Sequence, residues 1–162
     1  MQLDAEPLIT ALADKIGTLA PDTAVIGIHT GGVWAAERLH ARLGVALPLG
    51  KLAVTLHRDD FSRIGLHPTK KSTEMPFDVN GRHILLVDDV LNTGRTLRAA
   101  LNELFDFGRP ASVRLAVLVD RGRRELPFAA DYIGAIMTLD ASQELVLKND
   151  NNHLRFDVQT KG

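Results

Sequence analysis

The stretch "ILLVDDVLNTGRT" (84–96) joins an apolar run to two adjacent acids and a polar turn that contains glycine. The apolar residues 84–87 predict a short buried strand. Asp88 and Asp89 follow this strand directly, although neighbouring carboxylates repel each other and a buried charge is costly unless it has a partner. We therefore expect a ligand at this strand end that carries hydroxyl groups, a metal ion, or both.

The turn "NTGRT" (92–96) opens a predicted helix. The first backbone N–H groups of a helix lack internal partners, and the helix dipole favours an anion there. Gly94 allows a close approach of the backbone, and Thr93 and Thr96 add hydroxyl donors. These features predict a phosphate cradle, and carboxylates that accept hydrogen bonds from vicinal hydroxyls beside it predict a sugar phosphate as ligand. The plainer alternative is that Asn92 or Thr93 only caps the helix after an acidic strand end.

Outward from this stretch, apolar strands alternate with amphipathic helices. Such alternation predicts an α/β fold in which a mainly parallel sheet is covered by helices on both faces. We expect strands at 24–28, 51–57, 83–87, 113–119 and 131–137, helices at 5–19, from 29–32 to near Gly44 and at 95–107, and a hairpin of 144–148 with 154–158. Ligands of parallel sheets bind at the carboxyl ends of the strands, where "HTGG", "DDVLNTGRT" and "DRGRR" stand.

Residues 59–76 are polar, contain Gly65, Pro68 and Pro76, and show no sustained period. A stretch of this length without regular structure in a small domain is typical of a functional loop. We therefore expect residues 59–76 to form a lid.

The composition sets further limits. The 162 residues predict one domain, 1–162, and the net charge of −1 gives no overall basic field that would attract nucleic acid. The absence of cysteine excludes disulfides and thiolate metal sites. Apolar runs such as 115–119 are far shorter than the roughly 20 residues of a membrane-spanning helix, and the N-terminal stretch lacks the basic start of a signal peptide. We expect a cytoplasmic protein without membrane contact.

The opening stretch resembles the motif with which type I phosphoribosyltransferases bind phosphoribosyl pyrophosphate (PRPP). Three further segments, "IGIHTGGVWAAERL" (26–39), "VTLHRDDFS" (54–62) and "GRPASVRLAVLVDRGRRELPFAADYIG" (108–134), are similar to one family, PyrR, the pyrimidine operon regulators with uracil phosphoribosyltransferase activity. The resemblance covers residues 24–136. It implies the type I phosphoribosyltransferase fold, with a twisted sheet, a flexible lid loop and a small hood.

The resemblance also implies a PRPP site. Asp88 and Asp89 would bind the ribose hydroxyls and, with Arg58, act in catalysis. The PRPP-binding residues would be Asp88, Asp89, Val90, Leu91, Asn92, Thr93, Gly94, Arg95 and Thr96. Arg58 would help bind pyrophosphate ahead of the lid. Mg²⁺ is the implied cofactor, held by PRPP and water rather than by direct protein ligands, which suits this cation.

Two further loops receive roles from the same resemblance. His29, Thr30, Gly31 and Gly32 would form the pyrophosphate loop, and Val119, Asp120 and Arg121 would line the base pocket. His29 stands where relatives carry lysine, so a neutral side chain would weaken anion binding there.

The implied reaction joins uracil and PRPP to give UMP and pyrophosphate, in a homodimer. Two alternatives stay open. One is a regulator that senses UMP or UTP in the same pocket and binds pyr mRNA, and the other is a phosphoribosyltransferase for another base, such as a purine.

Departures from the family concern RNA. Asn92 replaces an aromatic residue, and Ala129 and Ala135 replace basic residues of RNA-binding members. Arg123 and Arg124 are candidate RNA contacts, with a solvated basic loop as the plainer alternative. Since RNA binding depends on phosphate neutralisation by Lys and Arg, we expect specific RNA binding to be absent or much weaker than in those relatives.

Overall fold

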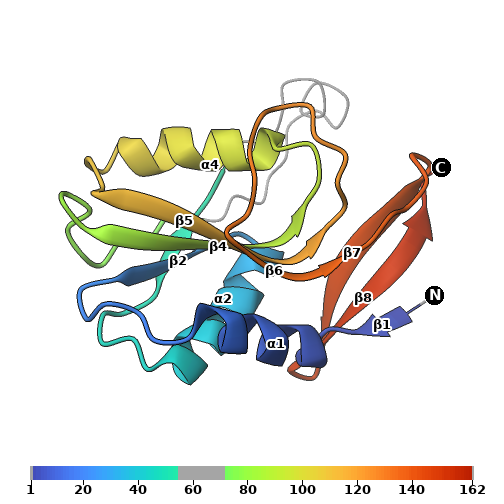
Figure 1. The fold of residues 1–162 in the computed structure, drawn as a ribbon, viewed down its shortest axis with the longest axis horizontal. Helices are drawn as coiled ribbons and strands as arrows, with labels where there is room; N and C mark the ends of the chain where they lie inside the picture. The colour runs from blue at the N-terminus through green and yellow to red at the C-terminus, as the bar shows by residue number, and fades with distance from the viewer. Residues whose placement is uncertain (1, 55–71, 162) are drawn as a thin grey trace.

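The computed structural model describes residues 2–54 and 72–161. Its centre is a parallel sheet in the order β3-β2-β4-β5-β6, with α1 and α2 on one face and α4 on the other (Figure 1). The strands are β2 (Ala24–Ile28), β3 (Gly50–Leu52), β4 (His83–Leu91), β5 (Ser112–Asp120) and β6 (Tyr132–Ile136), and the helices are α1 (Glu6–Ile16), α2 (Gly31–Leu43) and α4 (Arg95–Phe105). This architecture confirms the predicted α/β class.

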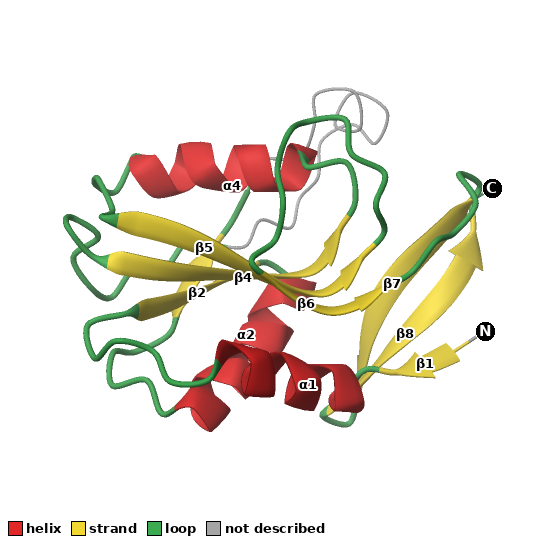
Figure 2. Cartoon of the chain, in the orientation of Figure 1, coloured by secondary structure: helices red, strands yellow, loops and turns green. Residues whose placement is uncertain are grey.

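A second, antiparallel sheet stands beside the first in the order β1-β8-β7 (Figure 2). It consists of β1 (Gln2–Asp4), β7 (Gln143–Asp150) and β8 (His153–Thr160), which are called the hood below. The predicted hairpin is confirmed as β7 and β8.

The core follows from the apolar strands. All five residues of β2 are buried, and so are Leu115 to Asp120 of β5, because helices cover both faces of the sheet. One cluster packs α1, α2 and the hood against the sheet, and a second cluster packs α4, through Leu97, Ala100 and Leu104, against the other face.

The hood is fixed to the helices by a polar contact. Arg38 of α2 donates from Nη1 to both carboxylate oxygens of Glu6 on α1, at 2.6 and 2.7 Å, and from Nη2 to the backbone carbonyl of Asn152. The Leu154 amide donates to Glu6 Oε2 at 2.9 Å. Burial acts to raise the pKa of Glu6, but the hydrogen bonds from Leu154 and Arg38 outweigh it, and the net pKa is lowered.

Some predicted boundaries were wrong. The first helix ends at Ile16 instead of residue 19, because Gly17 leaves the helical conformation with φ +66°. The strand expected at 51–57 is β3, Gly50–Leu52, and residues 55–57 lie outside the described residues. The strand expected to stop at residue 87 runs on to Leu91, so both acids belong to it.

The predicted lid lies largely outside the described residues. Of residues 59–76, the structure describes 72–76. Here Glu74 pairs with Lys51 of β3 through two backbone hydrogen bonds of 2.8 Å. The described part of the segment is thus anchored at the edge of the sheet.

Candidate active site

The end of β4 meets the loop that follows β2. The two strands are adjacent and parallel, with Gly27 opposite Val87, so their carboxyl ends lie side by side. A Cβ atom on Gly32 would lie 2.6 Å from the Val87 carbonyl oxygen and 3.1 Å from Asp88 Oδ1, and a Cβ atom on Gly31 would lie 2.2 Å from Asp89 Oδ2. The glycines therefore let the predicted pyrophosphate loop touch both acids.

The same loop is held from the other side by β3. The His29 amide donates to the Leu52 carbonyl at 3.0 Å, and the peptide bond between His29 and Thr30 is cis. Thr30 precedes α2 and accepts backbone hydrogen bonds from Val33 and Trp34. His29 and Thr30 thus connect β2 to α2, and Gly31 and Gly32 form the first turn of the helix, where the helix dipole favours an anion.

Asp88 and Asp89 are both partly buried, and each accepts a hydrogen bond from the next backbone amide, at 2.8 Å in both cases. Burial, then the charge of Asp89 and a side-chain hydrogen bond with it, raise the pKa of Asp88 well above its ordinary value. Such a pair concentrates unfavourable negative charge at the end of β4. A cation or hydroxyl donors nearby would relieve it, which is typical of a functional site.

The turn between β4 and α4 is built around Gly94. Its φ is +98°, and a Cβ atom there would lie 3.2 Å from a ring carbon of Phe128 and 3.4 Å from Cβ of Leu126. Thr93 Oγ1 accepts a hydrogen bond of 3.3 Å from the Arg95 amide. Arg95 and Thr96 are exposed at the start of α4, one turn of chain after the two acids at the end of β4.

The segment 121–128 covers this turn. The Thr93 carbonyl accepts hydrogen bonds from the amides of Glu125 and Leu126, at 2.9 and 3.0 Å, and Arg95 forms an ion pair with Glu125 at 2.7 Å. Arg124 extends across the same junction. Sequence reasoning did not identify Glu125, Leu126 or Phe128, since their contacts with the turn run largely through the backbone and no local pattern encodes them.

Arg124, one of the two candidate RNA contacts, is partly buried and binds groups of this protein. Its Nη1 and Nη2 donate to both oxygens of Asp120, at 2.9 and 2.6 Å, Nη1 also donates to the Asn92 carbonyl at 2.9 Å, and Nε donates to the Phe128 carbonyl at 2.7 Å. The hydrogen bonds from Arg124 hold the pKa of Asp120 below its ordinary value despite burial. Arg123, in contrast, is exposed.

The three predicted base-binding residues are buried. Val119 belongs to the core with no exposed surface, and Asp120 and Arg121 are 7% and 6% exposed. The Arg121 amide donates to the Leu91 carbonyl at 2.9 Å, and Nη2 donates to the Asp140 carbonyl at 3.2 Å. Burial lowers the pKa of Arg121. These side chains shape the end of β5 more than they line an open surface.

Three further predicted site residues are Val90, Leu91 and Arg58. Leu91 is buried in the core and Val90 is partly buried against it, so their side chains serve packing. Arg58 lies outside the described residues.

Within residues 2–54 and 72–161, no group of three or more His, Asp or Glu side chains is placed to hold a metal ion. The oxygens of Asp88 and Asp89 are the donor type that Mg²⁺ prefers, and their repulsion fits a cation brought by a ligand. In the same part of the chain, no helix is long and apolar enough to cross a bilayer.

Comparison with known proteins decides the family. A model of the phosphoribosyl transferase domain matches residues 3–143. The Bifunctional protein PyrR of Ralstonia nicotianae is 53% identical over 154 residues, which is 92% of this chain and 88% of the relative. The chain belongs to the PyrR family. A second PyrR, from Pseudomonas entomophila, is 56% identical over 122 residues, covering 75% of this chain and 71% of the relative.

Solved structures agree on the fold of this PyrR-family chain. A purine phosphoribosyltransferase from Pyrococcus horikoshii superposes with a TM-score of 0.61 at 28% identity, covering 80% of each chain. A hypoxanthine-guanine phosphoribosyltransferase from Bacillus anthracis gives a TM-score of 0.66 at 19% identity, covering 83% of this chain and 82% of the other. The predicted type I phosphoribosyltransferase fold is confirmed.

Proposed function

We propose that the protein transfers the phosphoribosyl group of PRPP to uracil, giving UMP and pyrophosphate, at the edge where β2 and β4 end. The observation that carries this proposal is the contact of Gly31 and Gly32 with Asp88 and Asp89. Together with the turn 92–96, this contact supports the proposal that a loop for pyrophosphate, acceptors for ribose hydroxyls and a cradle for the 5-phosphate share one edge of the sheet. PRPP carries these three groups, and the family model and the PyrR relatives support the same reaction.

The chemistry follows from this arrangement. The bond between C1 of the ribose and the pyrophosphate oxygen breaks, and a bond from C1 to N1 of uracil forms as N1 loses its proton to water. Negative charge grows on the leaving group, where the loop amides and the start of α2 stabilise it. Mg²⁺ bound with PRPP supplies further neutralisation. Asp88 and Asp89 hold the ribose, and such positioning can contribute about 7–11 kcal/mol.

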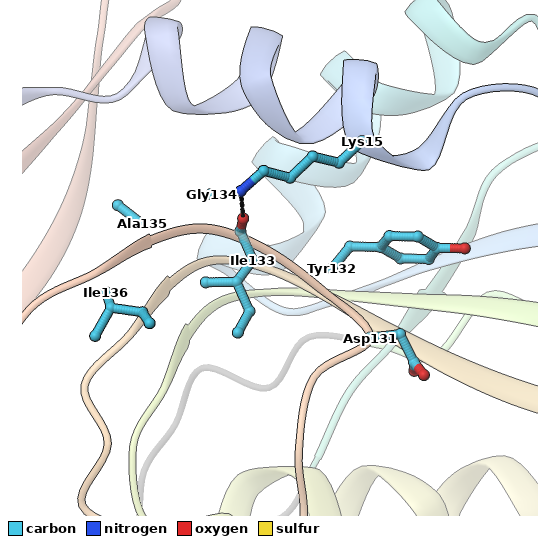
Figure 3. A pocket seen from close by; sticks show the side chains of 7 residues that line it. All are labelled: Lys15, Asp131, Tyr132, Ile133, Gly134, Ala135 and Ile136. Atoms are coloured by element: carbon cyan, nitrogen blue, oxygen red, sulfur yellow. Dashed lines mark hydrogen bonds between the residues drawn. The ribbon is translucent and has the colours of Figure 1, made fainter.

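RNA binding is the second candidate function. The groove between α1 and β6 is relevant because it contains Ala135, one of the two positions where a basic residue is expected in RNA-binding relatives. This groove has a volume of about 630 Å³ and is lined by Lys15 and by residues 131–136. Figure 3 shows the side chains that line it. Lys15 Nζ donates to the Ile133 carbonyl at 2.5 Å, and Asp131 adds an acid to the lining. Ala135 stands in this groove where we expect a basic residue in RNA-binding relatives. We therefore propose weak RNA binding at most.

The proposed reaction is tested with a panel of radiolabelled bases. Purified protein is incubated with PRPP, Mg²⁺ and one of uracil, hypoxanthine or guanine, and nucleotide products are separated. We expect UMP from uracil and little product from the purines. Product from a purine but not from uracil would show that the purine is the substrate. No product from any base would overturn the proposal that the protein is a transferase. A homodimer stays a prediction, which light scattering can check.

A further inference from the structure

We infer that Arg124 is a positioning residue that orients the phosphate cradle, an inference that rests on the proposed function. Its guanidinium joins two loops that the reaction needs at the same time. It holds Asp120 at the end of β5 with two hydrogen bonds, and it holds the Asn92 carbonyl in the turn after β4 with a third. A fourth, to the Phe128 carbonyl, closes the segment 121–128 on itself.

Because a peptide group is planar, a hydrogen bond to its carbonyl also fixes the direction of its amide. The peptide bonds on both sides of Thr93 are trans and therefore planar, so each carbonyl points opposite to the amide that follows it. Arg124 binds the Asn92 carbonyl, which directs the Thr93 amide away from the segment 121–128. The amides of Glu125 and Leu126 bind the Thr93 carbonyl, which directs the Gly94 amide the same way.

The two oriented amides belong to the turn that would receive the 5-phosphate. Amides fixed in advance bind an anion better than amides that must first rotate. Gly94 completes the arrangement, since a Cβ atom there would lie 3.2 Å from Phe128 and the segment could not approach the turn so closely. Arg124 thus acts on PRPP through the backbone and makes no contact with it.

An arginine suits this position better than a lysine. The planar guanidinium presents five donors in a fixed fork and here reaches Asp120, Asn92 and Phe128 together. A lysine ammonium keeps the charge beside Asp120 but cannot reach three acceptors arranged around a plane. Arg124→Lys therefore keeps the ion pair with Asp120 but loses the hydrogen bond that orients the turn, so its effect measures the orientation alone. Arg109→Gln is the matched control, because it removes one exposed arginine charge from a loop at the other end of β5.

The test compares UMP with uridine, which lacks the 5-phosphate, by calorimetry in the full-length protein. In Arg124→Lys and Arg124→Gln we expect the affinity for UMP to fall about tenfold, the usual effect of losing a hydrogen bond that orients a charged contact, while the affinity for uridine changes less than twofold. The KM for PRPP should rise by a similar factor with little change in the KM for uracil. Arg109→Gln should match the wild type.

Other outcomes separate the possible failures. An equal loss of UMP and uridine affinity in Arg124→Lys would show a merely structural role, and unchanged affinity for both ligands would show no role. Either result overturns the inference while the transferase stands. If the wild-type protein formed no nucleotide from PRPP with any of the bases, the proposed function itself would instead be overturned.

Discussion

Gly31 lies so close to Asp89 that a Cβ atom on the glycine would stand 2.2 Å from Oδ2 of the acid. The neighbouring Gly32 has a different constraint, because its Cβ atom would stand 2.6 Å from the backbone carbonyl oxygen of Val87. One contact is with the end of a side chain that can rotate, and the other is with the central strand of the sheet.

This difference predicts unequal effects on stability. Gly32→Ala should lower the free energy of unfolding by about 1–3 kcal/mol, as overpacking against fixed atoms does. Gly31→Ala should cost much less, because the Asp89 carboxylate can turn away. Urea denaturation of the two variants measures the contrast, and equal losses would show that the loop does not pack on β4 as described.

A second prediction concerns the charge of Asp88. Burial and the neighbouring Asp89 raise its pKa, so ionisation of this carboxyl group makes folding less favourable. Asp88→Asn should raise the free energy of unfolding at neutral pH, because the neutral amide avoids the repulsion from Asp89. Thermal denaturation checks this, with the exposed Asp22→Asn as control. A destabilised Asp88→Asn would contradict the account.

The pH dependence of the same group has a definite sign. A carboxyl group whose pKa is higher in the folded protein than its ordinary 3.8 makes folding less favourable as pH rises from about that value through the raised one. The difference in unfolding free energy between Asp88→Asn and wild type should therefore grow with pH in this window. A difference that stays constant across it would mean that Asp88 titrates normally.

Glu6 should show the opposite sign. Its pKa is lowered, so its contacts with Arg38 and Leu154 stabilise the fold above the ordinary value of 4.5, and this stability is lost as pH falls through the lowered pKa. Glu6→Gln should cost about 1–2 kcal/mol at pH 7 and less in acid. The exposed Glu37→Gln on α2 is the control. A loss of equal size at low and neutral pH would exclude the ionic contribution.

The RNA prediction can be tested in both directions. A gel-shift series with a pyr leader hairpin at physiological salt, with and without UMP, should show weak binding by the wild type. Ala129→Arg with Ala135→Lys should strengthen it, because each added phosphate contact increases the salt dependence and the affinity. Nanomolar, UMP-enhanced binding by the wild type would mean that Arg123 and surfaces outside the groove suffice.

Most of the fold could be predicted because it rests on local patterns. The apolar runs of β2, β4 and β5 and the periodic residues of α2 and α4 give the order of strands and helices directly. β1 could not be predicted, since its residues Gln2–Asp4 become a strand only by pairing with Arg155–Asp157, far away in the chain. The continuation of β4 through both acids was missed because its pairing with β5, not its own hydrophobicity, extends it.

The candidate site divides in the same way. Asp88, Asp89, Gly31, Gly32 and Gly94 stand out because acids and glycines at strand ends are unusual, and the structure brings the first four into contact. The role of Arg124 could not be inferred, because Asn92 lies 32 residues away in the chain, and because the Asn92 and Phe128 acceptors are backbone carbonyls that no side-chain pattern marks. An exposed arginine and a partly buried arginine that joins two loops look alike in a sequence.

The central claim is that the edge formed by the β2 loop and the end of β4 binds PRPP. Its most direct test is the initial rate of UMP formation at varied PRPP for the wild type, Asp89→Asn and the control Asp22→Asn. We predict that kcat/KM for PRPP falls at least tenfold in Asp89→Asn, roughly 1.4 kcal/mol, with the fold intact by circular dichroism and Asp22→Asn like the wild type. Unchanged kinetics in Asp89→Asn, and in Asp88→Asn beside it, would contradict the assignment of this edge as the PRPP site.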